Sequence, residues 1–227
     1  EFNEDSLKEY LENETGDITK DAKNASIDRV DGEFVVYKGE VGTSIDVDKT
    51  VKKVEDVFAA EWEQKDIKID AAVDEKEPQY TSKDFYSIDS VLGQGSTEYS
   101  QGNTERCQNL ATGASKISGT VLMPGESFSM LDTVLPFTEE NGYANAGQYE
   151  KDDKGSITLV DGLGGGICQV STTLYLAVLR AELDVNERYP HTFPASYVKH
   201  GMDAAISENA NMNFRFTNNT EYPIYID

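Results

Sequence analysis

Hydrophobic and polar positions follow helical and strand periods in the first half of this chain of 227 residues. In residues 46–62 the apolar side chains recur at steps of three and four, which predicts an amphipathic helix that Asp46 or Asp48 caps. These apolar side chains are Val47, Val51, Val54, Val57 and Phe58. β-Branched and aromatic residues predict strands at 33–39 and 66–73, and a short helix is predicted at 81–93.

The second half predicts a helix at 103–119, whose apolar face holds Cys107, Leu110, Ala111 and Ala114. Residues 120–130 predict a strand, a Pro-Gly turn and another short apolar piece. Residues 162–166 are too rich in glycine for regular structure, and a buried helix follows. Its apolar positions are Val170, Leu174, Ala177, Val178 and Ala181. The end, "NFRFTNNTEYPIYID", predicts two short strands around an Asn-Asn turn.

A turn-rich segment, "GQGSTEYSQGN" (residues 93–103), divides the chain. We expect two α+β domains, residues 1–95 and 96–227. The first is charged and holds no convergent set of titratable groups, so it is interpreted as a positioning or binding domain. In the second, we expect the helix that carries Cys168 to pack on an antiparallel sheet, with the loop of His191 reaching over its N-terminus.

Composition narrows the function classes. The chain has 42 acidic and 20 basic residues, a formal net charge of −22, which disfavours nucleic-acid binding. No apolar run approaches the roughly 20 residues that a membrane span needs. The first residues are consistent with a removed anchor, and the compartment stays open at this point. No close His/Cys pair has the spacing of metal ligands, so we expect neither a metal nor a cofactor.

Cys168 is the first candidate for chemistry, because it follows three glycines at the predicted start of a helix. Backbone N–H groups at a helix N-terminus favour the thiolate, which is the nucleophilic form. The N–H groups of Gly165 and Gly166 could hold a developing oxyanion. The alternative is a buried structural cysteine. Cys107 is interpreted as structural, and a Cys107–Cys168 disulfide stays open.

His191 is the candidate general base, because prolines on both sides stiffen its loop. Asp203 could orient the imidazole as the third member of a triad, or it could be a turn residue. His200 precedes a glycine and is expected in an exposed turn. Ser171 is expected to cap the helix or contact substrate. It is a weaker candidate for the nucleophile than Cys168, because the glycine turn does not lead directly into it.

Arg106 and Arg188 are cations in a chain that has few of them. Each could bind a substrate carboxylate through two parallel hydrogen bonds. An ordinary ion pair with one of the many acids is the alternative for both.

Several strings in the second half together resemble the VanW-domain family. These strings are "GGGICQVSTTLYLAVLRAEL", "ERYPHTFPASYVKHGMDAAI", "RCQNLATGASKISGTVLMPGESFSM", "NGYANAGQY" and "NFRFTNNTEYPIYI". The resemblance covers about residues 96–227, and the first part resembles a peptidoglycan-binding module that often precedes such a domain. Met202 and the pair Lys199-His200 depart from the family pattern.

The resemblance implies an extracellular cell-envelope protein of Gram-positive bacteria, membrane-anchored in its full length. It implies an L,D-transpeptidase that forms third-to-third cross-links between peptidoglycan stem peptides. Cys168 would be the nucleophile and His191 the base, whereas the role of Asp203 is inferred from triad geometry. The partners would be a tetrapeptide donor and the amine of a diamino acid as acceptor. The alternatives are a cysteine carboxypeptidase or endopeptidase of the same peptides, and a wall-binding module without catalysis.

Overall fold

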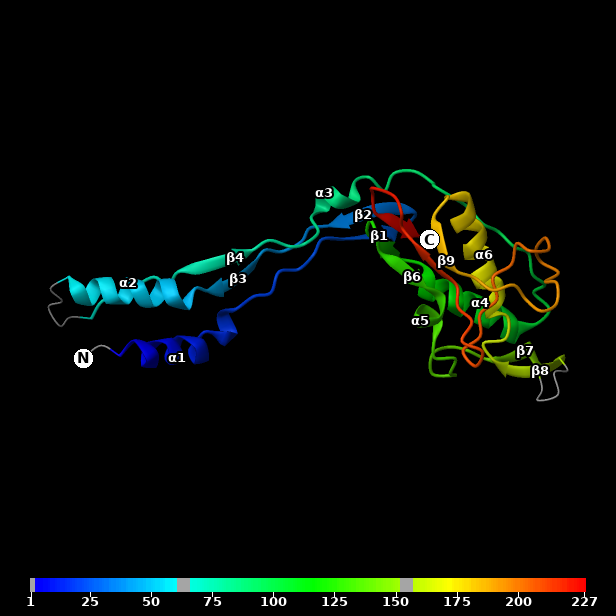
Figure 1. Ribbon diagram of the computed structural model, residues 1–227, viewed down its shortest axis with the longest axis horizontal. Coiled ribbons are helices and arrows are strands. Elements are labelled where there is room, and N and C mark those ends of the chain that lie inside the picture. The colour runs from blue at the N-terminus through cyan, green and yellow to red at the C-terminus, as the bar shows by residue number, and fades with distance from the viewer. Residues whose placement is uncertain (1–2, 61–65, 152–156) are drawn as a thin grey trace. The chain divides into compact units, whose positions relative to one another are not determined.

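The computed structural model describes residues 3–60, 66–151 and 157–227 (Figure 1). The chain forms two compact units, residues 1–86 and 87–227. Both combine helices with small antiparallel sheets, which confirms the α+β prediction. No helix in the described ranges is long and apolar enough to cross a membrane.

The first unit is built from two antiparallel strand pairs and short helices. Its elements are α1 (Glu4–Glu14), a 3-10 turn (Gly16–Ile18), β1 (Ser26–Val30), β2 (Glu33–Tyr37), β3 (Gly42–Ile45), α2 (Val47–Ala59), β4 (Val73–Lys76) and α3 (Ser82–Phe85). β1 pairs with β2, and β3 pairs with β4. The hairpin between β1 and β2 turns through Asp31 and Gly32, both with positive φ.

Several sequence predictions for this unit are confirmed. The predicted strand at 33–39 is β2, and the predicted helix at 46–62 is α2. Asp46 is the residue that caps α2, because its side chain accepts a hydrogen bond from the Lys49 N–H at 2.8 Å. The predicted end of this helix at Trp62 lies outside the described residues.

Two other predictions for the first half are wrong in extent. Residues 66–72 form no strand; instead the Ala72 N–H binds the Thr50 hydroxyl at 2.9 Å, and β4 begins only at Val73. The helix predicted at 81–93 ends at Phe85. Gly93 belongs to the second unit and packs on its helix α6 (Ile167–Arg180), so closely that a Cβ there would lie 2.3 Å from the Ala177 carbonyl oxygen.

In its described residues, 87–151 and 157–227, the second unit holds three small sheets and three helices. Its elements are α4 (Thr104–Ile117), β5 (Thr120–Leu122), β6 (Ser127–Ser129), α5 (Met130–Val134), β7 (Asn145–Lys151), β8 (Ile157–Leu163), α6 (Ile167–Arg180), β9 (Asp184–Glu187), β10 (Arg215–Thr217) and β11 (Ile224–Ile226). The strand orders are β6-β10-β9, β11-β5 and β7-β8, with antiparallel pairing throughout. The two C-terminal strands exist as predicted, but they join different sheets.

The core of this unit lies between α6 and the sheet of β6, β10 and β9. Phe214 and Phe216 are fully buried, and Phe214 meets Tyr175 of α6 edge to face with ring centroids 5.5 Å apart. The predicted helix at 103–119 is α4, capped by Asn103. Its buried face differs from the predicted one, because Ala111 and Ala114 are exposed.

Helices α4 and α6 pack directly against each other (Figure 1). The buried residues of α4 include Leu110, Gly113 and Ile117. A Cβ at Gly113 would lie 2.1 Å from Cδ1 of Ile167, so this glycine permits the close approach of the two helices. This approach brings the first turn of α4 to the N-terminus of α6.

Candidate functional site

Cys168 is the second residue of α6, directly after the glycine turn. Gly164 and Gly166 have φ values of +81° and +108°, in the region that L-residues rarely adopt. Gly165 is restricted by space instead, since a Cβ there would lie 2.2 Å from the Ala146 carbonyl oxygen. At each of the three positions a side chain is therefore excluded for a different steric reason, and together the three glycines lead the chain from β8 into α6.

Asn109 of α4 holds this turn in place. Its side chain is fully buried, and its amide nitrogen donates to the carbonyl oxygens of Gly165 at 3.0 Å and Ala144 at 2.9 Å. Its amide oxygen accepts from the Ala144 N–H at 2.7 Å. One side chain thus satisfies three buried backbone groups and fixes the approach to Cys168. Asn109 is not among the site residues predicted from the sequence, although its position three residues after Arg106 places both on one helical face.

Cys168 is a free, half-buried thiol. Its Sγ lies 3.4 Å from the carbonyl oxygen and 3.5 Å from the nitrogen of Ile206. Cys107 is also free, and its Sγ lies 3.7 Å from the Ser100 carbonyl oxygen. The Cys107–Cys168 disulfide that the sequence left open is therefore not formed.

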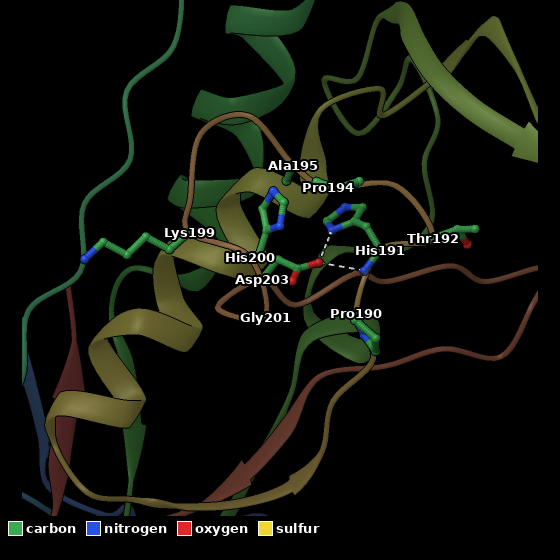
Figure 2. A pocket seen from close by; sticks show the side chains of 9 residues that line it. All are labelled: Pro190, His191, Thr192, Pro194, Ala195, Lys199, His200, Gly201 and Asp203. Carbon is green, nitrogen blue, oxygen red and sulfur yellow. Dashed lines mark hydrogen bonds and ion pairs between the residues drawn. The ribbon is translucent and has the colours of Figure 1, made fainter.

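His191 and Asp203 are joined by two short hydrogen bonds (Figure 2). Nδ1 of His191 lies 2.6 Å from Oδ2 of Asp203, and the backbone N–H of His191 donates to the same oxygen, also at 2.6 Å. A carboxylate that accepts from Nδ1–H fixes the tautomer in which Nε2 accepts a proton. His191 also interacts with Cys168, and this interaction raises the pKa of the imidazole. The structure thus brings the three predicted catalytic residues together.

The pKa shifts of His191 and Asp203 favour a protonated imidazole beside an ionised carboxylate. Burial lowers the pKa of His191, but hydrogen bonds and charge attraction from Cys168 and Asp203 outweigh it and raise the pKa above its ordinary value. Burial in turn raises the pKa of Asp203, whereas the hydrogen bonds from the backbone and ring of His191 lower it more strongly. Asp203 therefore stays ionised at neutral pH and stabilises an imidazolium.

Arg188 binds the main chain and the other carboxylate oxygen of Asp203. Its Nε donates to the Asp203 carbonyl oxygen at 2.6 Å, and one terminal nitrogen lies 2.8 Å from the Gly201 carbonyl oxygen and 3.3 Å from Oδ1 of Asp203. The guanidinium also lies over the ring of Tyr175, 5.4 Å from its centroid. Because these contacts lie within the protein, we expect Arg188 to hold Asp203 in place and not to bind a substrate carboxylate.

Ser171 does not lie where a substrate contact requires it. The side chain is fully buried, and within the described residues its hydroxyl oxygen has no hydrogen-bond partner. The structure gives no support to the prediction that Ser171 binds substrate, because its side chain is fully buried in the core of the unit.

Tyr197 and Thr172 complete the surroundings of Cys168, and Tyr197 was not predicted as a site residue from the sequence. Tyr197 forms a side-chain hydrogen bond with Thr172 and meets the ring of His191 edge to face, with centroids 6.4 Å apart. Burial and then the charge of Cys168 raise the pKa of Tyr197 to about 12. Tyr197 lies in the same proline-flanked loop as His191, which is the signal that could have identified it.

A hollow of about 150 Å³ opens beside His191 (Figure 2). The loop around His191 and the turn around His200 form its walls, and its lining residues are Pro190, His191, Thr192, Pro194, Ala195, Lys199, His200, Gly201 and Asp203. Asp203 and Arg188 fix both walls, because they bind His191 on one side and the Gly201 carbonyl on the other. His200 lies in an exposed turn, as predicted, but next to the candidate site. Among the described residues, no group of three or more His, Cys, Asp or Glu side chains is arranged to hold a metal ion.

Comparisons with known proteins assign each unit to a sequence family. Residues 105–227 match the family model described as "VanW like protein", and residues 1–77 match the one described as "Putative peptidoglycan binding domain". The "Uncharacterized protein YoaR" of Bacillus subtilis (strain 168) is 40% identical over 135 residues, 60% of this chain and 43% of the relative. The chain thus spans less than half the length of this relative. No solved structure matches the chain. The two family matches associate it with the bacterial cell wall.

Proposed function

This chain belongs to the VanW-like family, and we propose that it is a cysteine-dependent L,D-transpeptidase that forms third-to-third cross-links in peptidoglycan. One observation carries the proposal: Cys168, at the start of α6, interacts with His191 and raises the pKa of its imidazole, and Nδ1 of His191 lies 2.6 Å from Asp203. A thiol, a base and a group that orients the base form the minimal set for acyl transfer through a covalent intermediate.

In the first step, Cys168 attacks the carbonyl carbon of the third residue of a tetrapeptide donor, and His191 takes the thiol proton. The resulting imidazolium is stabilised by Asp203. The tetrahedral intermediate then collapses, the bond to the terminal D-Ala breaks, and His191 protonates the leaving amine. The product of this step is a thioester on Cys168 and free D-Ala.

In the second step, the side-chain amine of the third residue of a neighbouring stem peptide attacks the thioester. His191 accepts a proton from this amine, the new amide bond forms, and the thiolate of Cys168 leaves and recovers a proton from His191. No water is consumed. A thiolate suits both transfers, because it is a good nucleophile and also a good leaving group.

The oxyanion is stabilised by backbone N–H groups at the end of the glycine turn. Gly165 donates weakly within the turn, to the Gly162 carbonyl oxygen at 3.3 Å. We therefore propose that the N–H groups of Gly166 and Cys168, both at the N-terminus of α6, are the main donors to the oxyanion. The loss of one such donor typically costs about 10²- to 10³-fold in rate.

We infer that the first unit binds the enzyme to the cell wall. Its match to a peptidoglycan-binding domain supports peptidoglycan as the partner. We assign the protein to the extracellular face of the cell envelope, where stem peptides are cross-linked. The free state of both cysteines favours catalysis over a purely wall-binding role, since a disulfide would block the nucleophile.

Incubation with muropeptides that contain tetrapeptide stems tests the proposal by mass spectrometry. We expect dimers that have lost one D-Ala, and no dimers from Cys168→Ala; Cys107→Ala is the matched control and should retain activity. Loss of D-Ala without dimers would assign a carboxypeptidase instead. Cleavage of existing cross-links would assign an endopeptidase. Activity that survives Cys168→Ala would refute the nucleophile.

A further inference from the structure

Gln169, the residue after Cys168, connects three parts of the second unit. Its side chain is buried, with 3% exposed. The amide nitrogen donates to the Thr97 hydroxyl at 3.1 Å and to the Glu98 carbonyl oxygen at 2.9 Å. The amide oxygen accepts from a terminal nitrogen of Arg106 at 2.7 Å. Because a guanidinium only donates, this contact also fixes which end of the amide faces Arg106.

Arg106 lies against the glycine turn. Its guanidinium is so close to Gly166 that a Cβ at this glycine would lie 2.6 Å from a terminal nitrogen of Arg106. Arg106 and Cys168 both act on the pKa of Tyr197 through their charges, so the guanidinium belongs to the same cluster as the nucleophile. In the described part of this strongly acidic chain, Arg106 makes no ion pair with a carboxylate.

The segment of residues 93–98 holds the other end of Gln169 rigidly. A Cβ at Gly95 would lie 2.2 Å from the Thr173 carbonyl oxygen, so the segment packs directly on the backbone of α6. The hydroxyls of Thr97 and Thr173 are 2.7 Å apart. The donors of Gln169 therefore bind partners that are themselves fixed.

We infer that Arg106 binds a carboxylate of the donor stem peptide other than the C-terminal one, and that Gln169 is the positioning residue that aims its guanidinium. This inference rests on the proposed function, since it takes the stem peptide as the ligand. A neutral amide fixes the guanidinium without neutralising it, whereas an Asp or Glu at the same place would cancel its charge. The half-buried guanidinium of Arg106 keeps further N–H donors, and its planar fork matches the geometry of a carboxylate.

Steady-state kinetics with two donors test the inference. One donor is a synthetic tetrapeptide with free carboxylates, and the other carries amides in their place except at its C-terminus. Gln169→Glu adds a carboxylate beside Arg106 with almost no change in size. We expect the KM of the free-carboxylate donor to rise about tenfold to a hundredfold, with kcat nearly unchanged and little change for the amidated donor. Gln101→Glu, an exposed change of the same charge, is the control.

Arg106→Gln provides a second variant, because its side chain is only half-buried and its loss leaves the core intact. It should likewise raise the KM of the free-carboxylate donor toward that of the amidated donor. Adding Gln169→Glu to this variant should have little further effect on KM. Equal KM values for both donors in the wild type, or unchanged discrimination in Arg106→Gln, would overturn the inference.

Calorimetric binding of the two peptides to Cys168→Ala separates this inference from the proposed function. If the wild type does not turn over the tetrapeptide and Cys168→Ala does not bind it, the proposed function itself is refuted. Wild-type protein that turns over both donors equally well would refute only the role of Arg106.

Discussion

Nδ1 and the backbone N–H of His191 both lie 2.6 Å from one carboxylate oxygen of Asp203. The carboxylate thus fixes the ring and the main chain of the base at once. Because Arg188 binds the other oxygen and two carbonyl groups nearby, Asp203 is itself held in place. The orientation of His191 toward Cys168 therefore depends on a side chain that is 5% exposed.

Asp203→Asn should preserve the fold but reduce kcat by about 10²- to 10⁴-fold, because an amide that faces Nδ1 favours the wrong tautomer of His191. The measurement is the rate of D-Ala release from a tetrapeptide donor. Asp132→Asn, which changes an exposed acid paired with Arg215, is the control and should retain the wild-type rate. A kcat within threefold of wild type in Asp203→Asn would exclude the triad role.

The raised pKa of His191 is open to direct measurement by NMR titration of the imidazole C–H signals. We expect the pKa of His191 to lie above 6.5 in the wild type and to fall in Cys168→Ala and in Asp203→Asn, because each change removes a partner that raises it. His200 gives a second signal in the same spectrum. A pKa of His191 that is unaffected by both changes would contradict the hydrogen-bond geometry.

The same groups give a defined pH dependence of stability. The folded-state pKa of His191 is raised, so its contribution is fully present below the unfolded value near 6.5 and is lost as pH rises through the folded pKa. The pKa of Asp203 is lowered, so its contribution is present above the unfolded value near 3.8 and is lost as pH falls through the folded pKa. Denaturant unfolding should therefore show the largest destabilisation by His191→Gln between about pH 4 and 6.5, and a smaller one at pH 9. A difference that grows above pH 7 would contradict this sign.

Asn109→Ala should lower the free energy of unfolding by about 2–4 kcal/mol, because it removes three hydrogen bonds to the backbone of Ala144 and Gly165. Gln108→Ala is the matched control on the same helix: Gln108 is exposed and makes a single hydrogen bond to Gly142, so we expect less than about 1 kcal/mol. Denaturant unfolding of both variants provides the comparison. Equal losses would show that Asn109 does not support the glycine turn.

Gly166→Ala should destabilise the protein more than Gly125→Ala, although both residues have positive φ. At Gly125 a Cβ meets nothing within 4 Å, so only backbone strain of about 1 kcal/mol is expected. At Gly166 the Cβ also collides with Arg106, so the guanidinium must move. Thermal unfolding measures both changes. Similar shifts of Tm would mean that Arg106 moves aside without cost.

The sequence predicted the parts of the site that local geometry controls. Three glycines followed by an apolar run identify the turn and the start of α6, because backbone freedom and helical periodicity are local properties. Prolines on both sides of His191 likewise identified a stiff loop. The strand predicted at 66–73 and the helix predicted at 81–93 were wrong in extent, because contacts with distant helices replaced local hydrogen bonds there.

Only the tertiary structure decided which side chains meet. Asn109 and Gln169 are ordinary polar residues in the sequence, and they become important because the crossing of α4 and α6 brings them to the glycine turn. Ser171 is a candidate by its closeness to Cys168 along the chain, yet tertiary packing buries its side chain completely. Cys168, His191 and Asp203 were named from the sequence, but their contact depends on long-range packing, which places the loop of His191 over the start of α6.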